Sequence, residues 1–138
     1  MYLDVPPAPA GRPATIERRV TVPSADPPLS QDSVTYGGLV FTTQIPERPD
    51  GSLELGPISA QADLVLNNLR RTLTAAGSGL DRLLHLTIYL TDMADRDVFN
   101  QLYQRLVPEP YPVRCAVAVS ALAVAGMRIE LTAIAARP

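Results

Sequence analysis

The chain contains no lysine, because all twelve of its basic residues are arginines. A protein-derived Schiff base, including lysine-bound pyridoxal phosphate, is therefore excluded. The chain has a single cysteine, Cys115, and a single histidine, His85. These numbers exclude an intramolecular disulfide and a zinc site made of the cysteines and histidines of one chain. A Ser-His-Asp triad would have to use His85, for which the sequence offers no evident partner and which we interpret as an ordinary sheet residue.

Long apolar runs and strong charge are also missing. The net charge is −2 and no block of like charge occurs, which argues against a nucleic-acid or membrane surface. No apolar run reaches about 18 residues without a charge, so we expect no membrane span. The first residues, "MYLDVPPAPAGRPAT", lack the basic start and apolar run of a signal peptide. We therefore expect a cytoplasmic protein.

The length and composition predict one folded domain. The chain has 138 residues, of which 46% are hydrophobic, enough to build a core of its own. Residues 1–15 are rich in proline and alanine, which predicts a flexible N-terminal arm. We expect residues 16–138 to form the single domain.

Apolar residues spaced three and four apart predict two helices. The first has Ser59 as a candidate N-cap and Gly77 just past its end, and its apolar stripe consists of Ala62, Val65, Leu66, Leu69, Leu73 and Ala76. The second covers about 95–106 and ends at Pro108, with Val98, Phe99, Leu102 and Leu106 directed inward. The aspartates of "TDMADRD" fit an N-terminal cap and charge bias for this second helix, not a metal site.

Strands are predicted around these helices, at 18–22, at 33–45 as a hairpin turning at Gly37 and Gly38, and at 83–91, 111–120 and 127–135. In the strand at 83–91 the alternation places Leu84, Leu86, Ile88 and Leu90 on one face, and His85, Thr87 and Tyr89 on the other.

The order of these elements predicts an α+β fold, in which two helices pack on one face of a single mixed sheet. The other face of the sheet then needs a cover. A closed oligomer provides one, and it places binding sites at subunit borders.

The segment "YPVRCAVAVS" places Arg114 at the start of a strand of small apolar residues. On an extended strand Arg114 shares a face with Ala116 and Ala118, whose small side chains leave room for a ligand beside the guanidinium. Such a group is suited to bidentate binding of a carboxylate. The alternative is a structural ion pair with an acid on a neighbouring strand.

Glu130 lies within the apolar segment "IELTAIA" of the last predicted strand. A partly buried carboxylate there could relay a proton or position a water molecule. The alternative for Glu130 is a salt bridge to Arg114 or Arg128.

Three further sites carry polar or reactive side chains. Thr42–Gln44 end a strand where hydroxyl and backbone N–H groups can meet a ligand, although capping of the strand end is the alternative. Asn100 lies early in the second helix, either in the site or as a solvated helix residue. Cys115 points away from the face of Arg114, and we interpret it as a small core residue.

Several segments together resemble the YjgF/YER057c/UK114 family, also called the Rid (reactive intermediate deaminase) family. The resemblance runs from about Val34 to Arg137, and its segments are "GGLVFTTQIP", "AQADLVLNNLRRTLTAAGSGLDRLLHLTIYLTDM", "FNQLY", "YPVRCAV" and "RIELTAIAA". It implies a chorismate-mutase-like α+β fold, a homotrimer with its helices outside, and clefts between subunits.

The resemblance also implies an activity. Active members hydrolyse 2-imino acids or their enamines to 2-keto acids and ammonia, without a metal or an organic cofactor. The implied partner is a small imino or keto acid with a carboxylate, together with further copies of the chain. The family's carboxylate-binding arginine falls on Arg114, its water-associated glutamate on Glu130 and its helix asparagine on Asn100.

Three positions depart from the family pattern and predict a reshaped pocket. Ala116 stands where the family often has cysteine, Thr43 stands where it has a glycine before "QIP", and Leu29 matches a pocket tyrosine. Backbone groups near Ala116 and Thr43 would complete the site. Two further hypotheses therefore stay open: a specialised biosynthetic enzyme acting on a larger imine or enol by hydrolysis, tautomerisation or cyclisation, and a non-enzymatic metabolite-binding trimer.

Overall fold

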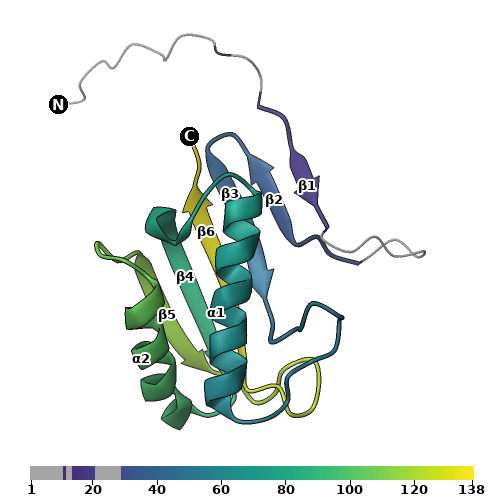
Figure 1. The fold of residues 1–138 in the computed structure, drawn as a ribbon, viewed down its shortest axis with the longest axis vertical. Helices are drawn as coiled ribbons and strands as arrows, with labels where there is room; N and C mark the ends of the chain where they lie inside the picture. The colour runs from purple at the N-terminus through teal and green to yellow at the C-terminus, as the bar shows by residue number, and fades with distance from the viewer. Residues whose placement is uncertain (1–10, 12–13, 21–28) are drawn as a thin grey trace, which may run out of the picture.

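Six strands form one mixed sheet in the computed structural model, which describes residues 11, 14–20 and 29–138 (Figure 1). Along the sheet the order is β1-β2-β3-β6-β4-β5, and only β4 and β5 run parallel. The strands are β1 (Glu17–Arg19), β2 (Ser33–Tyr36), β3 (Leu39–Gln44), β4 (Leu83–Leu90), β5 (Val113–Ala118) and β6 (Ile129–Ala136). Most of the expected arm at 1–15, and the end of the strand expected at 18–22, lie outside the described residues.

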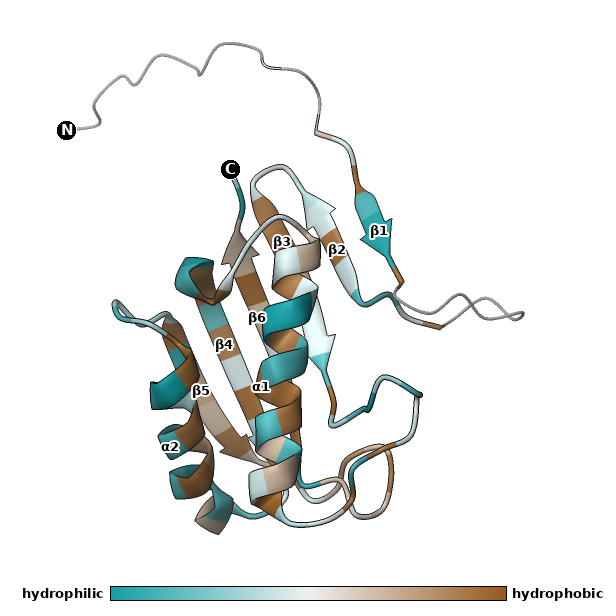
Figure 2. Ribbon diagram, in the orientation of Figure 1, coloured by the Kyte–Doolittle hydropathy of each residue, from teal (hydrophilic) through white to brown (hydrophobic). Residues whose placement is uncertain are grey.

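Two helices, α1 (Ile58–Ala75) and α2 (Arg96–Leu106), cover the same face of the sheet (Figure 1). Short 3₁₀ turns, η1 (Leu80–Arg82) and η2 (Met93–Asp95), precede β4 and α2. The expected α+β architecture, with both helices on one face, is thus confirmed. The core lies between the layers, and Figure 2 shows hydrophobic positions along the helices and along the strands that they cover. The core includes Leu66, Leu69, Leu73, Leu86, Ile88, Phe99 and Leu131.

The start of α1 differs from the prediction, because Ser59 does not cap it. The helix begins two residues earlier than this cap would place it, with extended Pro57 at the N-cap and no capping side chain. The carbonyl of Pro57 accepts hydrogen bonds from Ala60 and Gln61. Proline suits this position since its fixed φ and missing N–H cost little at a helix start. At the other end the prediction is confirmed, since Gly77 adopts a positive φ of 82°.

The start of β4 also differs from simple alternation. The prediction that Leu84 shares a face with Leu86 is wrong: Leu84 is 45% exposed, whereas Leu83 and Leu86 are buried. A register shift between Leu83 and His85 causes this change, because β4 there has an extra residue relative to β6. From Leu86 onward the expected alternation holds.

The sheet face away from the helices has no covering layer among the described residues. Cys115 lies on this face and is exposed, so its interpretation as a core residue is wrong. The physical reason is that β5 is an edge strand whose inward face is taken by Arg114 and Ala116. We call the uncovered side the open face. It also exposes the apolar side chains of Phe41, Val113 and Val117.

Candidate functional site

Arg114 lies on the helix side of β5 and is held by side chains of α2. It pairs in register with the buried Leu86 of β4, which fixes the face that it occupies. Its guanidinium donates a hydrogen bond to Oδ1 of Asn100. The guanidinium carbon also lies 4.6 Å from the centre of the Tyr103 ring and 5.7 Å from that of Phe99. Both distances are in the range of cation–π contacts, so three residues of one helix turn fix the position of the charge.

No carboxylate pairs with Arg114 within residues 11, 14–20 and 29–138. The structural ion pair that the sequence left open is therefore not found in this part of the chain. Instead, the guanidinium borders a pocket of about 300 Å³. The residues that line this pocket are Asn100, Tyr103, Gln104, Tyr111, Pro112 and Arg114. A cation without an anionic partner beside a pocket is suited to an anionic ligand.

Tyr103 contacts Arg114 through the face of its ring. The hydroxyl is buried and has no hydrogen-bond partner among the described residues. Burial raises the pKa of Tyr103, and the positive charge of Arg114 only partly opposes this effect. Tyr103 is therefore neutral at physiological pH, and the electron-rich face of its ring stabilises the guanidinium.

Glu130 lies on the open face, on the other side of the sheet from Arg114. It is partly buried and pairs with Tyr89 of the adjacent strand β4. Its neighbours along β6, Ile129 and Leu131, point into the core. The alternative of a salt bridge to Arg114 or Arg128 is not found in the described part of the chain.

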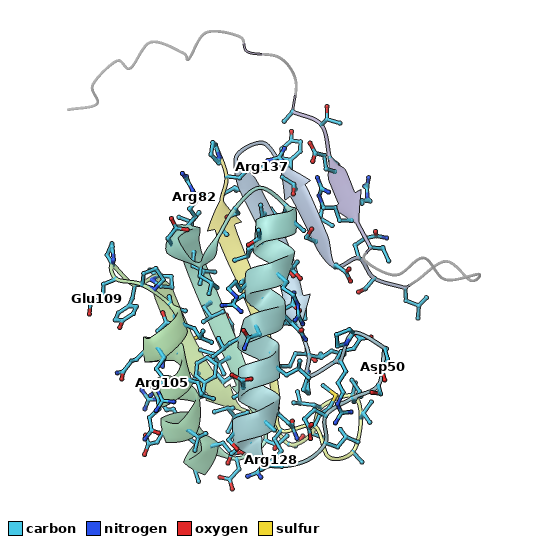
Figure 3. The ribbon with its side chains drawn as sticks, in the orientation of Figure 1. Asp50, Arg82, Arg105, Glu109, Arg128 and Arg137 are labelled. Carbon is cyan, nitrogen blue, oxygen red and sulfur yellow. The ribbon has the colours of Figure 1, made fainter. Side chains whose placement is uncertain are left out.

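Arg128 binds another acid, near the end of the molecule opposite Arg137 (Figure 3). Its Nη2 and Nε donate to the carboxylate of Asp95, at 2.7 and 3.0 Å. Among the aspartates before α2, Asp92 accepts a hydrogen bond from the N–H of Ala94, and Asp95 ties α2 to the start of β6. Asp95 occupies the N-cap of α2 without a capping side-chain hydrogen bond, so the side-chain cap expected for this helix is wrong, whereas Asp97 gives the expected acidic first turn.

Thr43 lies on the same face as Glu130, in a shallow hollow of about 440 Å³. The hollow is lined by Ser30, Gln31, Val34, Phe41, Thr42, Thr43, His85, Thr132, Ala133 and Ile134. The predicted pocket residue Leu29 precedes this segment, but it is fully exposed and does not line the hollow. His85, interpreted from the sequence as an ordinary sheet residue, also lines the hollow.

Thr42 and Gln44 point to the helix side and serve the fold. Thr42 donates a hydrogen bond to the carbonyl of Asp32, and the Gln44 side chain bonds the hydroxyls of Thr42 and Thr72. The strand-end alternative is therefore confirmed for these two residues. Thr43, between them, is exposed and remains accessible to a ligand.

The predicted site residues thus fall into two groups on opposite faces of the sheet. Asn100 and Ala116 lie with Arg114 on the helix side, whereas Thr43 lies with Glu130 on the open face. One copy of the chain cannot bring Arg114 and Glu130 to the same small ligand.

Tyr103 and Tyr111 are residues that sequence reasoning missed. Tyr103 follows Asn100 by three residues and Phe99 by four, so helical spacing could have placed it on the same face. For Tyr111 the only signal was its place just before the strand of Arg114.

Comparison with known proteins identifies the family of this chain. The family model described as Endoribonuclease L-PSP matches residues 20–137. The chain belongs to this family, which includes the YjgF and Rid proteins. The mitochondrial protein mmf2 of Schizosaccharomyces pombe is 36% identical over 75% of this chain and 84% of its own length. The reactive intermediate deaminase TdcF of Escherichia coli is 33% identical over 83% of this chain and 91% of its own length.

Solved structures of family members have the same fold. The crystal structure of the yeast protein YEO7 has a TM-score of 0.80 and 32% identity, and covers 90% of this chain and 100% of that chain. The structure of TdcF with bound serine has a TM-score of 0.76 and 29% identity, and the match covers 88% of this chain and 100% of that chain. Serine carries a carboxylate, so a member of this family binds a small ligand of the expected class.

No cluster of three or more histidine, cysteine, aspartate or glutamate side chains among the described residues could hold a metal ion. No helix in this part of the chain is long and apolar enough to cross a membrane.

Proposed function

We propose that this protein is an imine/enamine deaminase of the cytoplasm, which hydrolyses 2-imino acids to 2-keto acids and ammonia without a cofactor. The observation that carries the proposal is the guanidinium of Arg114, held by Asn100 and Tyr103 beside a pocket and paired with no described carboxylate. Family membership and the deaminase-named relative TdcF give further support.

In the proposed reaction Arg114 binds the substrate carboxylate and thereby orients the adjacent imine carbon. Glu130 accepts a proton from a water molecule whose oxygen attacks that carbon, and the imine nitrogen takes up a proton from solvent. The resulting carbinolamine then loses its C–N bond as Glu130 returns the water proton to the nitrogen. Ammonia leaves, the hydroxyl proton of the carbinolamine passes to solvent, and the carbon keeps the oxygen as a ketone. One water is consumed, and no oxidant or metal is required.

A second copy of the chain completes the proposed site, because Arg114 and Glu130 lie on opposite faces of one sheet. We propose a closed homotrimer, in which the helix-side edge of one copy meets the open face of the next. The exposed apolar side chains of Phe41, Val113 and Val117 on the open face support such an assembly. Thr43 and the backbone near Ala116 would then line the cleft from the two sides.

An RNA substrate is disfavoured, although the family description names an endoribonuclease. Binding to RNA depends on neutralising phosphates with basic side chains, and the net charge of this chain is −2. The proposed partner is therefore a small imino or keto acid rather than a nucleic acid.

The test follows the decay of 2-iminopropionate generated in situ by a pyridoxal-dependent dehydratase. We expect the wild-type protein to accelerate this decay and Arg114→Ala to lower kcat/KM by about 30-fold or more, the usual cost of removing one partner of a buried charge pair. The exposed Arg70 of α1 offers a control, and Arg70→Ala should keep full activity. No acceleration by the wild type would favour the metabolite-binding hypothesis, and full activity in Arg114→Ala would refute the proposed role of this arginine.

A further inference from the structure

The pocket beside Arg114 extends beyond what a carboxylate needs. Its volume is about 300 Å³, which is room for roughly ten water molecules at ~30 Å³ each. The guanidinium occupies one side of it, and the remaining walls come from α2 and from the segment just before β5. A substrate as small as 2-iminopropionate would leave most of this space to water.

Aromatic rings form the main apolar wall of this pocket. The rings of Phe99 and Tyr103 stack with their centres 5.9 Å apart, and the rings of Tyr103 and Tyr111 lie 5.4 Å apart at an angle of 38°. The series begins in the core, where Phe99 is 1% exposed, and ends at Tyr111, which is 45% exposed. Tyr111 thus presents ring surface to whatever enters the pocket, and Pro112 adds a second apolar surface.

The guanidinium and the aromatic wall are adjacent, because Arg114 lies over the ring of Tyr103 while Tyr111 contacts the same ring. A ligand that places its carboxylate on the guanidinium therefore has an aromatic wall within reach of its side chain. A further ring packed against Tyr111 would extend the series in the offset or tilted geometry that aromatic pairs prefer.

We propose that this pocket binds the side chain of the substrate and selects imino and keto acids with an aromatic or similarly large planar side chain. The inference rests on the proposed function for the position of the carboxylate. It goes beyond that function by naming the substrate class and the residue, Tyr111, that determines it.

The test compares binding of pyruvate and phenylpyruvate, the keto-acid products, by isothermal titration calorimetry. Burial of a phenyl group is expected to make phenylpyruvate bind on the order of tenfold more tightly than pyruvate. Tyr111→Ala should reduce this ratio towards one while changing pyruvate binding little, and Tyr111→Phe should keep the ratio because it keeps the ring. Tyr36→Ala, at an exposed tyrosine of β2, is the matched control and should behave as the wild type.

The outcomes separate this inference from the proposed function. Equal affinities for the two acids, a preference that survives in Tyr111→Ala, or no binding of either acid would overturn the inference. The imine-decay assay decides the proposed function independently. Acceleration of 2-iminopropionate decay without a phenylpyruvate preference would leave the deaminase standing and refute only the aromatic pocket. A preference that depends on Tyr111, without any imine hydrolysis, would support the pocket and refute the deaminase.

Discussion

Arg114 and Glu130 lie on opposite faces of one sheet, and the two faces hold their charges in different ways. On the helix side, Asn100 and the rings of Phe99 and Tyr103 fix the guanidinium within a single chain. On the open face, Glu130 lies beside Tyr89 without an ion pair in the described residues.

The groups around Arg114 form a helix-side half-site, and those around Glu130 form an open-face half-site. This difference suggests that the two half-sites depend differently on assembly of the oligomer. The helix-side half is preorganised and should bind a carboxylate even where assembly is impaired. The open-face half needs a second surface before its carboxylate faces a substrate. Substitutions on the two faces should therefore change different kinetic quantities.

The largest effect is expected at the open face. Glu130→Gln removes the proton acceptor but keeps the shape of the side chain, so kcat should fall about 10²- to 10⁴-fold, the usual contribution of general acid–base catalysis. The affinity for pyruvate should change little, because Arg114 is untouched. Steady-state kinetics and calorimetry measure the two quantities, and Glu47→Gln, at an exposed glutamate, is the control. A loss of affinity with unchanged kcat would place Glu130 in binding instead.

A smaller effect is expected at Asn100 on the helix side. Asn100→Ala removes the hydrogen bond to the guanidinium, and such bonds to charged groups contribute about 1.5–3 kcal/mol. Because that bond positions Arg114, KM and the Kd of pyruvate should rise by about tenfold or more while kcat falls less. Asn67→Ala, at an asparagine of α1 that bonds within its own helix, is the control. Unchanged pyruvate affinity would show that Asn100 does not position Arg114.

Two substitutions at Tyr103 distinguish the contribution of its ring from that of its hydroxyl. Tyr103→Leu removes the cation–π contact, worth about 0.5–2 kcal/mol, so KM should rise by about 2- to 30-fold. Tyr103→Phe keeps the ring and removes a buried hydroxyl that lacks a partner, so KM should stay the same and thermal stability should be equal or higher. Thermal unfolding and kinetics of both variants test this pair. A rise of KM in Tyr103→Phe would mean that the hydroxyl, and not the ring, supports the site.

The smallest effect is expected at the ion pair of Glu17 and Arg137, which joins β1 to the residue after β6. Hydrogen bonds from Arg137 hold the pKa of Glu17 below its usual range. Because folding lowers this pKa, the ion pair stabilises the folded protein when the pH is above the pKa of the glutamate in the unfolded chain. This stabilisation is lost as the pH falls through the lower pKa of the glutamate in the folded protein. Glu17→Gln should therefore lower Tm slightly at pH 7, by an amount that vanishes in acid, with unchanged kcat/KM. A Tm difference that persists unchanged at low pH would contradict this account.

The order of the elements could be predicted from the sequence, because the apolar stripe of α1 and the alternation within β6 are regular. The same alternation fixes the face of Glu130, since Ile129 and Leu131 on either side of it must point into the core. The face of Arg114 could not be predicted, because β5 carries small apolar residues on both sides, such as Ala116 and Val117. Only the pairing with Leu86 and the position of α2 decide it. The bulge at Leu83 likewise depends on how β4 pairs with β6, which no local sequence pattern reveals.

The most direct test of the central claim mixes two inactive variants. Arg114→Ala and Glu130→Gln proteins are co-refolded, and subunit exchange is verified by native mass spectrometry. If each site takes its arginine from one copy and its glutamate from another, random assembly restores both groups at about one quarter of the sites. We therefore predict that the mixture recovers about one quarter of the wild-type rate, although each variant alone is nearly inactive. A mixture that has exchanged subunits and stays inactive would show that Arg114 and Glu130 do not act together across a subunit border.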